Sequence, residues 1–170
     1  MHFTLSGDGM ESFQGTIYAQ DANFVMSSPQ VEVYVSGPTK WIYSVGINEV
    51  MVMPHDPTMV DIFQNPLSLF SSNLSKEYKV SDKPVYVQKE GREVTEISLT
   101  PTGKGVPYTL VVLRLDRQSQ TPQSIQFDAK DGSRFEVVIT GYKPLSKPFS
   151  PEYFTFPTQK HPEVYVTDLR

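Results

Sequence analysis

The sequence predicts a mainly β protein, and three observations support that class. Of its 170 residues, 39 are Val, Ile or Thr, whereas only 13 are Ala or Leu. Phe, Tyr and Trp add 20 aromatic residues. β-Branched and aromatic side chains suit a pleated, half-buried surface, whereas Ala and Leu lead the helix scale. Alternating segments also recur about every 8 to 12 residues with turn residues between them, which is typical of an antiparallel sheet.

Length and composition limit the class of protein further. A chain of 170 residues argues for a single domain spanning residues 1–170. The absence of Cys excludes a disulfide scaffold, a thiolate metal site and a Cys nucleophile. A net charge of −4 without a basic stripe argues against a nucleic-acid partner. Strand-like residues follow Met1 at once, so we expect either a cytoplasmic chain or one whose targeting segment has been removed.

The first third of the chain has the alternation expected of short strands. In one of them, Val31, Val33 and Val35 share one side, and the Ser36–Gly37–Pro38 cluster then marks a turn. The alternating segments predict strands at residues 2–5, 12–20, 23–28, 30–35, 40–45 and 49–53.

The strand pattern breaks at Pro54, and a helical pattern replaces it. Asp56–Pro57 is a helix start, because Asp is a good N-cap and Pro suits the first helical position. Asn65–Pro66 repeats that signal. Apolar residues follow each start at helical spacing, namely Met59, Ile62 and Phe63, then Leu67, Phe70 and Leu74. The sequence therefore predicts two short helices forming an insertion at about residues 56–74.

Strands resume after the insertion. Lys130–Asp131–Gly132 is a hairpin turn of the Asp-Gly kind. The tail predicts one helical turn at residues 150–154, followed by extended chain at 164–166. The remaining strands are expected at residues 76–80, 84–89, 94–100, 106–117, 123–129 and 134–142.

No pattern in the sequence indicates catalysis. His2, His55 and His161 are far apart and have no ligand-like spacing, so we expect no metal site. No Gly-x-Ser-x-Gly elbow is present. Gly103–Lys104–Gly105 lacks the spacing of a phosphate-binding loop and precedes a strand, which favours a hairpin loop. We therefore expect neither an enzyme nor a bound cofactor.

Several strands have apolar residues on both faces, which indicates a sheet covered on both sides. Residues 50–53 and 110–113 are uninterrupted apolar runs of this kind. One interpretation is a sandwich, or a sheet packed by a helix. The other is a curved sheet whose concave face binds an apolar ligand beneath the short helices. Met26, Met51, Met53 and Met59 would suit such an adaptable surface, although Met is also common core filler.

Four stretches of the chain carry short motifs in a definite order. Phe13–Tyr18 has Gln-Gly followed by an aromatic residue, and Phe24–Met26 starts with an aromatic residue and has a Pro after it. Lys40–Tyr43 with Asn48–Val50 is a Trp-x-Tyr strand with its hairpin, and Ile97–Pro101 contains a Leu-x-Pro after the helical insertion. The order of these segments resembles the LolA family, the periplasmic carriers of outer-membrane lipoproteins, and the end at Phe154–Pro157 and Val164–Arg170 resembles short members of Bacteroidetes type.

The resemblance implies an unclosed antiparallel β half-barrel with a short helical lid over a hydrophobic cavity. It also implies a periplasmic, monomeric carrier that binds acyl chains without chemistry. Such a carrier takes acylated lipoproteins from an inner-membrane transporter and passes them to an outer-membrane acceptor. Burial of an acyl chain contributes about 0.8 kcal/mol per CH₂, so a dry, adaptable cavity suits this task. The residues expected to line cavity and lid are Ile17, Phe24, Met26, Val33, Trp41, Met59, Ile62, Phe63, Leu67 and Phe70.

The sequence departs from the family pattern in two places. The family usually begins with a long amphipathic helix that forms part of the lid, whereas this sequence starts about where the first strand is expected. We therefore expect either that this helix has been removed or that the cavity is more open than usual. Where better-studied carriers have an Arg-containing turn that latches the lid, this chain has Gln20–Asp21–Ala22. An alternative function on the same fold therefore stays open, namely an envelope-stress sensor or another lipid- or protein-binding module.

Overall fold

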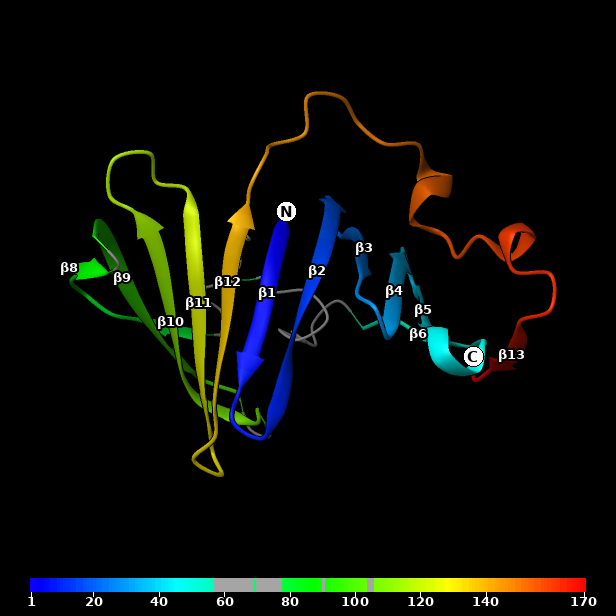
Figure 1. Ribbon diagram of the computed structural model, residues 1–170, viewed down its shortest axis with the longest axis horizontal. Coiled ribbons are helices and arrows are strands. Elements are labelled where there is room, and N and C mark those ends of the chain that lie inside the picture. Colours follow the sequence, from blue (N-terminus) through cyan, green and yellow to red (C-terminus); the bar gives the residue numbers. More distant parts are fainter. Residues whose placement is uncertain (57–68, 70–77, 90, 104–105) are drawn as a thin grey trace. The chain divides into compact units, whose positions relative to one another are not determined.

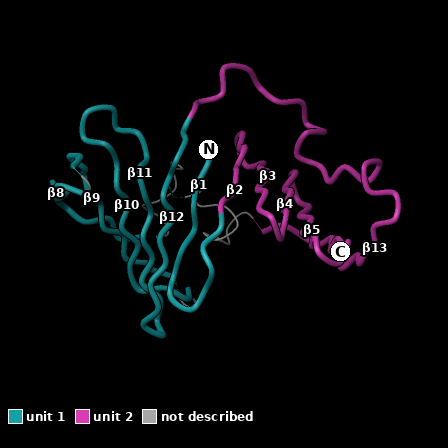
Figure 2. Tube along the Cα trace, in the orientation of Figure 1, with its two compact units in different colours: residues 1–13, 69–142 teal, residues 14–68, 143–170 magenta. Residues whose placement is uncertain are grey.

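Thirteen β-strands make up most of the described chain (Figure 1). The computed structural model describes residues 1–56, 69, 78–89, 91–103 and 106–170. Residues 1–13 and 69–142 form one compact unit, and residues 14–68 and 143–170 form the other (Figure 2). The predicted helical insertion at residues 56–74 lies almost entirely outside the described residues.

The first unit is an antiparallel sheet in the order β1-β12-β11-β10-β9-β7, with β8 also paired to β9. Its strands are β1 (His2–Gly7), β7 (Tyr78–Val80), β8 (Val85–Lys89), β9 (Arg92–Pro101), β10 (Tyr108–Asp116), β11 (Pro122–Ala129) and β12 (Arg134–Gly141).

Two glycines in this unit have a specific structural role. Gly132 adopts a φ of 90° in the hairpin between β11 and β12, a conformation that side chains disfavour. At Gly7, a Cβ atom would lie 2.2 Å from Cδ1 of Phe135, because the Phe135 ring lies over the backbone of β1. Only glycine therefore permits this close approach of β12 to β1.

The second unit is built on five antiparallel strands in the order β2-β3-β4-β5-β6. The bounds are β2 (Met10–Gln20, whose first residues belong to the first unit), β3 (Asn23–Ser27), β4 (Val31–Ser36), β5 (Thr39–Ser44), the 3₁₀ turn η1 (Val45–Ile47) and β6 (Glu49–Pro54). Each strand lies within one or two residues of its predicted bounds, because the alternation that marks a strand is a local property.

A C-terminal segment, residues 143–170, completes the second unit. We call it the strap. It contains the 3₁₀ turns η3 (Pro151–Phe154) and η4 (Thr158–Lys160) and the strand β13 (Tyr165–Asp168). The one-turn helix and the extended end agree with the sequence expectation. However, β13 pairs parallel to β6 and not antiparallel. A parallel partner cannot be reached by a tight turn, and here residues 55–164 connect β6 to β13.

These observations confirm the predicted mainly β class with an unclosed sheet. The ladder of strands ends at β13 and at β7, and no described hydrogen bonds pair these two strands. In the described part of the chain, no helix has both the length and the apolar character needed to cross a membrane.

Candidate functional site

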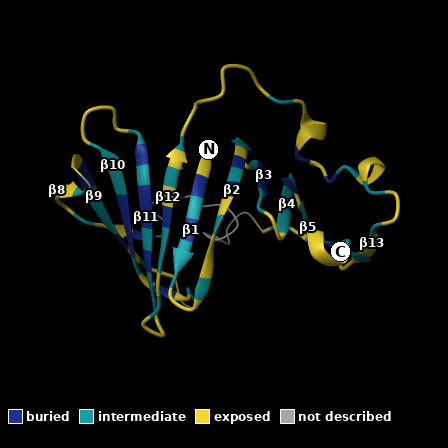
Figure 3. Ribbon diagram, in the orientation of Figure 1, coloured by how far each residue is buried: buried dark blue, intermediate teal, exposed yellow. Residues whose placement is uncertain are grey.

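Four of the predicted cavity residues share one side of the second unit's sheet, which we call face A. Ile17 lies opposite Met26, and Met26 lies opposite Val33. Directly paired residues project to the same face, so the three side chains form a row across β2, β3 and β4. Phe24 precedes Met26 by two residues and shares its face. All four are buried, with exposed fractions between 1% and 5% (Figure 3).

The row extends beyond the predicted residues. Val33 lies opposite Ile42 of β5, and Ile42 lies opposite Met51 of β6. Val35, which faces Phe24 across the ladder, is completely buried. Sequence reasoning named Met51 as suited to an adaptable apolar surface but did not assign Val35 or Ile42 to the cavity. The alternation of Val31, Val33 and Val35 could have identified Val35, whereas Ile42 needed the register between strands.

Trp41, the fifth predicted cavity residue in this unit, does not share face A. It lies opposite Tyr34 and Val52, one position out of phase with Val33 and Ile42. Its side chain is therefore on the other side of the sheet, which we call face B. There it packs against the buried cluster of Tyr43, Val50 and Phe156. Successive side chains in a strand point to opposite faces, so Trp41, one residue before Ile42, lies on the side opposite to face A.

Aromatic side chains of the strap occupy face B. The ring of Phe149 lies 5.7 Å from that of Tyr18 and stacks on Tyr153 at 4.2 Å. Phe156 packs edge-on against Tyr34, with ring centroids 5.6 Å apart. Such ring pairs contribute stabilising free energy in addition to that of the apolar area that they bury. Protein side chains of the strap therefore occupy face B, whereas face A, which is also buried, carries four of the predicted cavity residues.

Polar contacts hold the strap in register with the sheet. The Phe149 amide donates a hydrogen bond to Gln20 Oε1 at 2.7 Å. Asn48, in the left-handed conformation after η1, accepts from the Tyr43 hydroxyl and donates to the Glu163 carbonyl at 3.1 Å. These contacts tie η1 to the strap immediately before β13 begins.

A phenol on face B is also held in its neutral form. The Tyr34 hydroxyl donates to Glu32 Oε2 at 2.8 Å. Burial first, and then the hydrogen bond to Glu32 and its charge, raise the pKa of Tyr34 well above its usual range. The Tyr34 hydroxyl therefore stays protonated at physiological pH and serves as a structural hydrogen-bond donor to Glu32.

The other predicted site residues lie outside the described part of the chain. These are the lid residues Met59, Ile62, Phe63, Leu67 and Phe70. In the same stretch, Leu69 is described, and it is completely buried.

The first unit has one apolar face and one polar face. Val111 lies opposite Leu99 and Phe127, and all three side chains are essentially inaccessible to solvent. Leu113 and Ile125 extend this apolar face, with Val137 next to Ile125. It is therefore a second apolar surface, formed by β9 to β12.

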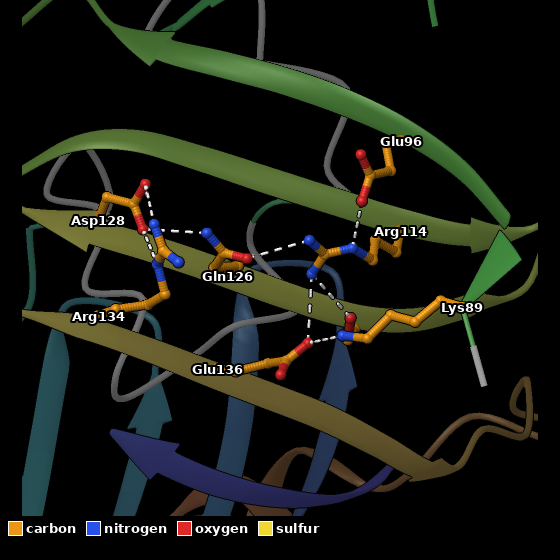
Figure 4. Close-up of polar contacts among 8 residues, drawn as sticks. Lys89, Glu96, Arg114, Gln126, Asp128, Arg134 and Glu136 are labelled. Carbon is orange, nitrogen blue, oxygen red and sulfur yellow. Dashed lines mark hydrogen bonds and ion pairs between the residues drawn. The ribbon is translucent and has the colours of Figure 1, made fainter. Parts of the chain in front are cut away.

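The polar face of this unit is organised around Arg114 (Figure 4). Its Nε donates to Glu96 Oε1 at 2.6 Å, and its two terminal nitrogens reach Glu136 at 3.2 Å and Gln126 at 3.0 Å. Lys89 also pairs with Glu136. The described partners satisfy the guanidinium on each side, so the cluster is a structural ion-pair network rather than a vacant binding site.

A second ion pair adjoins this network. Arg134 Nε donates to Asp128 Oδ1 at 2.8 Å, and Gln126 links Asp128 to Arg114 (Figure 4). The hydrogen bond from Arg134 lowers the pKa of Asp128 despite the opposing effect of desolvation. A cavity of about 730 Å³ borders Asp128, Arg134 and Glu136. Its charged lining does not suit an acyl chain.

No metal site is found among the described residues, where no group of three or more His, Asp or Glu side chains is arranged to hold an ion. The described sites thus consist of two apolar faces and one internally paired polar network.

Comparisons with known proteins report a likeness of fold. No protein-family model and no curated protein matches the chain. An uncharacterized conserved protein from Thermus thermophilus superposes with a TM-score of 0.62 at 11% identity, covering 98% of this chain and 88% of that one.

Two further structures match less closely. A putative outer membrane lipoprotein-sorting protein domain from Vibrio parahaemolyticus has a TM-score of 0.48 at 12% identity, covering 89% of this chain and 86% of that one. LolA superfamily protein NE2245 from Nitrosomonas europaea has a TM-score of 0.43 at 10% identity, covering 91% and 87%. In its fold, the chain is similar to LolA-like proteins, as its motifs predict.

Proposed function

We propose that this chain is a carrier of acylated lipoproteins or lipids that binds acyl chains on its apolar faces without chemistry. The observation that carries this proposal is the composition of face A. Ile17, Met26 and Val33 form a continuous apolar row, with Phe24 beside it. Aliphatic, Met and Phe side chains offer an acyl chain dispersion contacts without a polar group that would have to be desolvated.

The difference between the two sides of this unit supports the same proposal. The strap closes face B with aromatic contacts and backbone hydrogen bonds, so that side is committed to the protein's own packing. Face A has the unbranched Met26 and Met51, whose flexible thioethers adapt to a mobile chain. We further propose a periplasmic location, transfer toward the outer membrane, and the transporter and acceptor partners that the LolA resemblance implies.

Titration with a fluorescent fatty-acid probe tests the proposal, using two variants of one strand. Phe24→Glu places a carboxylate on face A, and Val25→Glu places one at the neighbouring buried position on face B. We expect Phe24→Glu to weaken probe binding at least tenfold, because a carboxylate among apolar groups must be desolvated or protonated. Val25→Glu should bind the probe like the wild type.

Folding must be separated from binding in this test. Far-UV circular dichroism and thermal unfolding identify any variant that no longer folds, and Met26→Gln supplies an uncharged substitution of similar length on face A. Equal probe affinity in Phe24→Glu, Met26→Gln and wild type would refute the assignment of face A. Mass spectrometry of an organic extract of the native protein then separates a lipid carrier from a module that binds only a protein partner, since only the carrier yields acyl lipid.

A further inference from the structure

Thr95 has a buried hydroxyl group that no other group satisfies. It lies in β9, opposite Leu115 of β10 and Tyr86 of β8. Only 7% of the residue is exposed, and its Oγ1 atom has no hydrogen-bond partner. It is the one buried side-chain oxygen or nitrogen without a partner among the described residues of the chain.

The side chains that follow Thr95 on its face of β9 are apolar. Thr95 shares its side of β9 with Ile97 and Leu99, which lie two and four residues further along the strand. Leu113, opposite Ile97, continues the apolar face on β10. None of these side chains accepts a hydrogen bond. Buried hydroxyls in native proteins nearly always have a partner, so an exception calls for a physical explanation.

We propose that Thr95 donates a hydrogen bond to the carbonyl oxygen of an ester- or amide-linked acyl group bound on the apolar face of the first unit. This inference rests on the proposed acyl-binding function and specifies the chemistry of its ligand. The hydroxyl supplies one donor, and a neutral carbonyl supplies the matching acceptor. The neighbouring hydrocarbon of Ile97, Leu99 and Leu113 suits the chain attached to that carbonyl.

The same surroundings favour a neutral carbonyl over the carboxylate of a free fatty acid. An ionised carboxylate at this position would be desolvated, and it would need a cation to offset that cost. The nearby Arg117 is already engaged, since its Nη1 pairs with Glu93 at 3.0 Å and its guanidinium lies 4.7 Å from the Tyr86 ring centroid. Thr95 therefore favours an esterified or amide-linked acyl chain, which is the form that lipoproteins and phospholipids have.

Two lipids that differ only in their carbonyl groups test this inference. The probes are a diacyl phosphatidylcholine and a dialkyl ether phosphatidylcholine of equal chain length, each used to displace a fluorescent fatty-acid probe from the full chain. We expect the wild type to bind the ester lipid about three- to tenfold more tightly, the range given by one neutral hydrogen bond. Thr95→Val should weaken binding of the ester lipid by that factor and leave the ether lipid unchanged, whereas Thr95→Ser should retain the preference.

Thr95→Val preserves the shape of the side chain and removes the unsatisfied hydroxyl, so we expect it to unfold at or above the wild-type temperature. Equal affinity of the wild type for both lipids would overturn the inference alone, and so would an equal weakening of both lipids in Thr95→Val. The first outcome is also expected if an internal water satisfies Thr95. Failure of the wild type to bind either lipid would overturn the proposed function together with this inference.

Discussion

Replacement of Arg114 by Met should destabilise the protein by about 2 kcal/mol, a value that follows from the geometry of its network. The Arg114 side chain is 11% exposed, and it contacts Glu96 at 2.6 Å and Glu136 at 3.2 Å. Removing one member of a fully buried ion pair costs about 3–5 kcal/mol, whereas an exposed pair contributes about 0–1 kcal/mol. Glu96 and Glu136 are 24% and 29% exposed, so water partly solvates both carboxylates after the substitution. The expected cost therefore lies between these limits.

Differential scanning calorimetry or denaturant unfolding measures the effect. At about 2–4 °C per kcal/mol for a chain of this size, the unfolding temperature should fall by about 4–8 °C. Arg170→Met is the matched control, because Arg170 pairs with Asp168 at 2.6 Å while both side chains are about half exposed. Its unfolding temperature should equal that of the wild type within error. A fall of less than 1 °C in Arg114→Met, or an equal fall in both variants, would refute the structural role of the network.

Three further predictions concern pH, backbone packing and the strap. Burial alone would raise the pKa of Glu136, but the hydrogen bond and charge of Lys89, with Ser124 and Arg114, lower it below its ordinary value of 4.5. Glu136 therefore contributes stability that is present above pH 4.5 and is lost as the pH falls through the lower folded-state pKa. Lys89→Met should flatten the dependence of the unfolding free energy on pH between about 5 and 3. An unchanged slope in that variant would contradict this account. Gly7→Ala should lower the free energy of unfolding, measured by chemical denaturation, by about 1–3 kcal/mol, because the added Cβ meets the Phe135 ring. Gly46→Ala, with open space around the added Cβ, should leave that free energy unchanged. Phe156→Ala should lower the free energy of unfolding by about 3–5 kcal/mol. It should also shift the fluorescence emission of Trp41, the single Trp of the chain, to longer wavelength as water reaches the cluster. An emission spectrum like that of the wild type would show that the strap does not shield Trp41.

Local patterns predict the strands of this protein well. The strand predicted at residues 30–35 is observed at Val31–Ser36, and the one predicted at 134–142 is observed at Arg134–Gly141. The Asp131–Gly132 hairpin follows from the preference of Gly for positive φ. These features depend on a few consecutive residues, so the sequence contains them directly.

The pairing between strands is not a local property, and the candidate site depends on it. The position of Trp41 on face B follows from the pairing of Val33 with Ile42, which no single strand determines. Likewise, Arg114 meets Glu96 and Glu136 across separations of 18 and 22 residues. The parallel pairing of β13 with β6 depends on the path of the strap.

Photo-crosslinking with a diazirine-labelled acyl chain, followed by peptide mass spectrometry, tests the central claim most directly. The chain of the bound probe should label residues of face A in β2, β3 and β4, among them Ile17, Met26 and Val33. Excess unlabelled acyl lipid should suppress this labelling. Labelling confined to the strap and face B, or labelling that no competitor suppresses, would contradict acyl binding on face A.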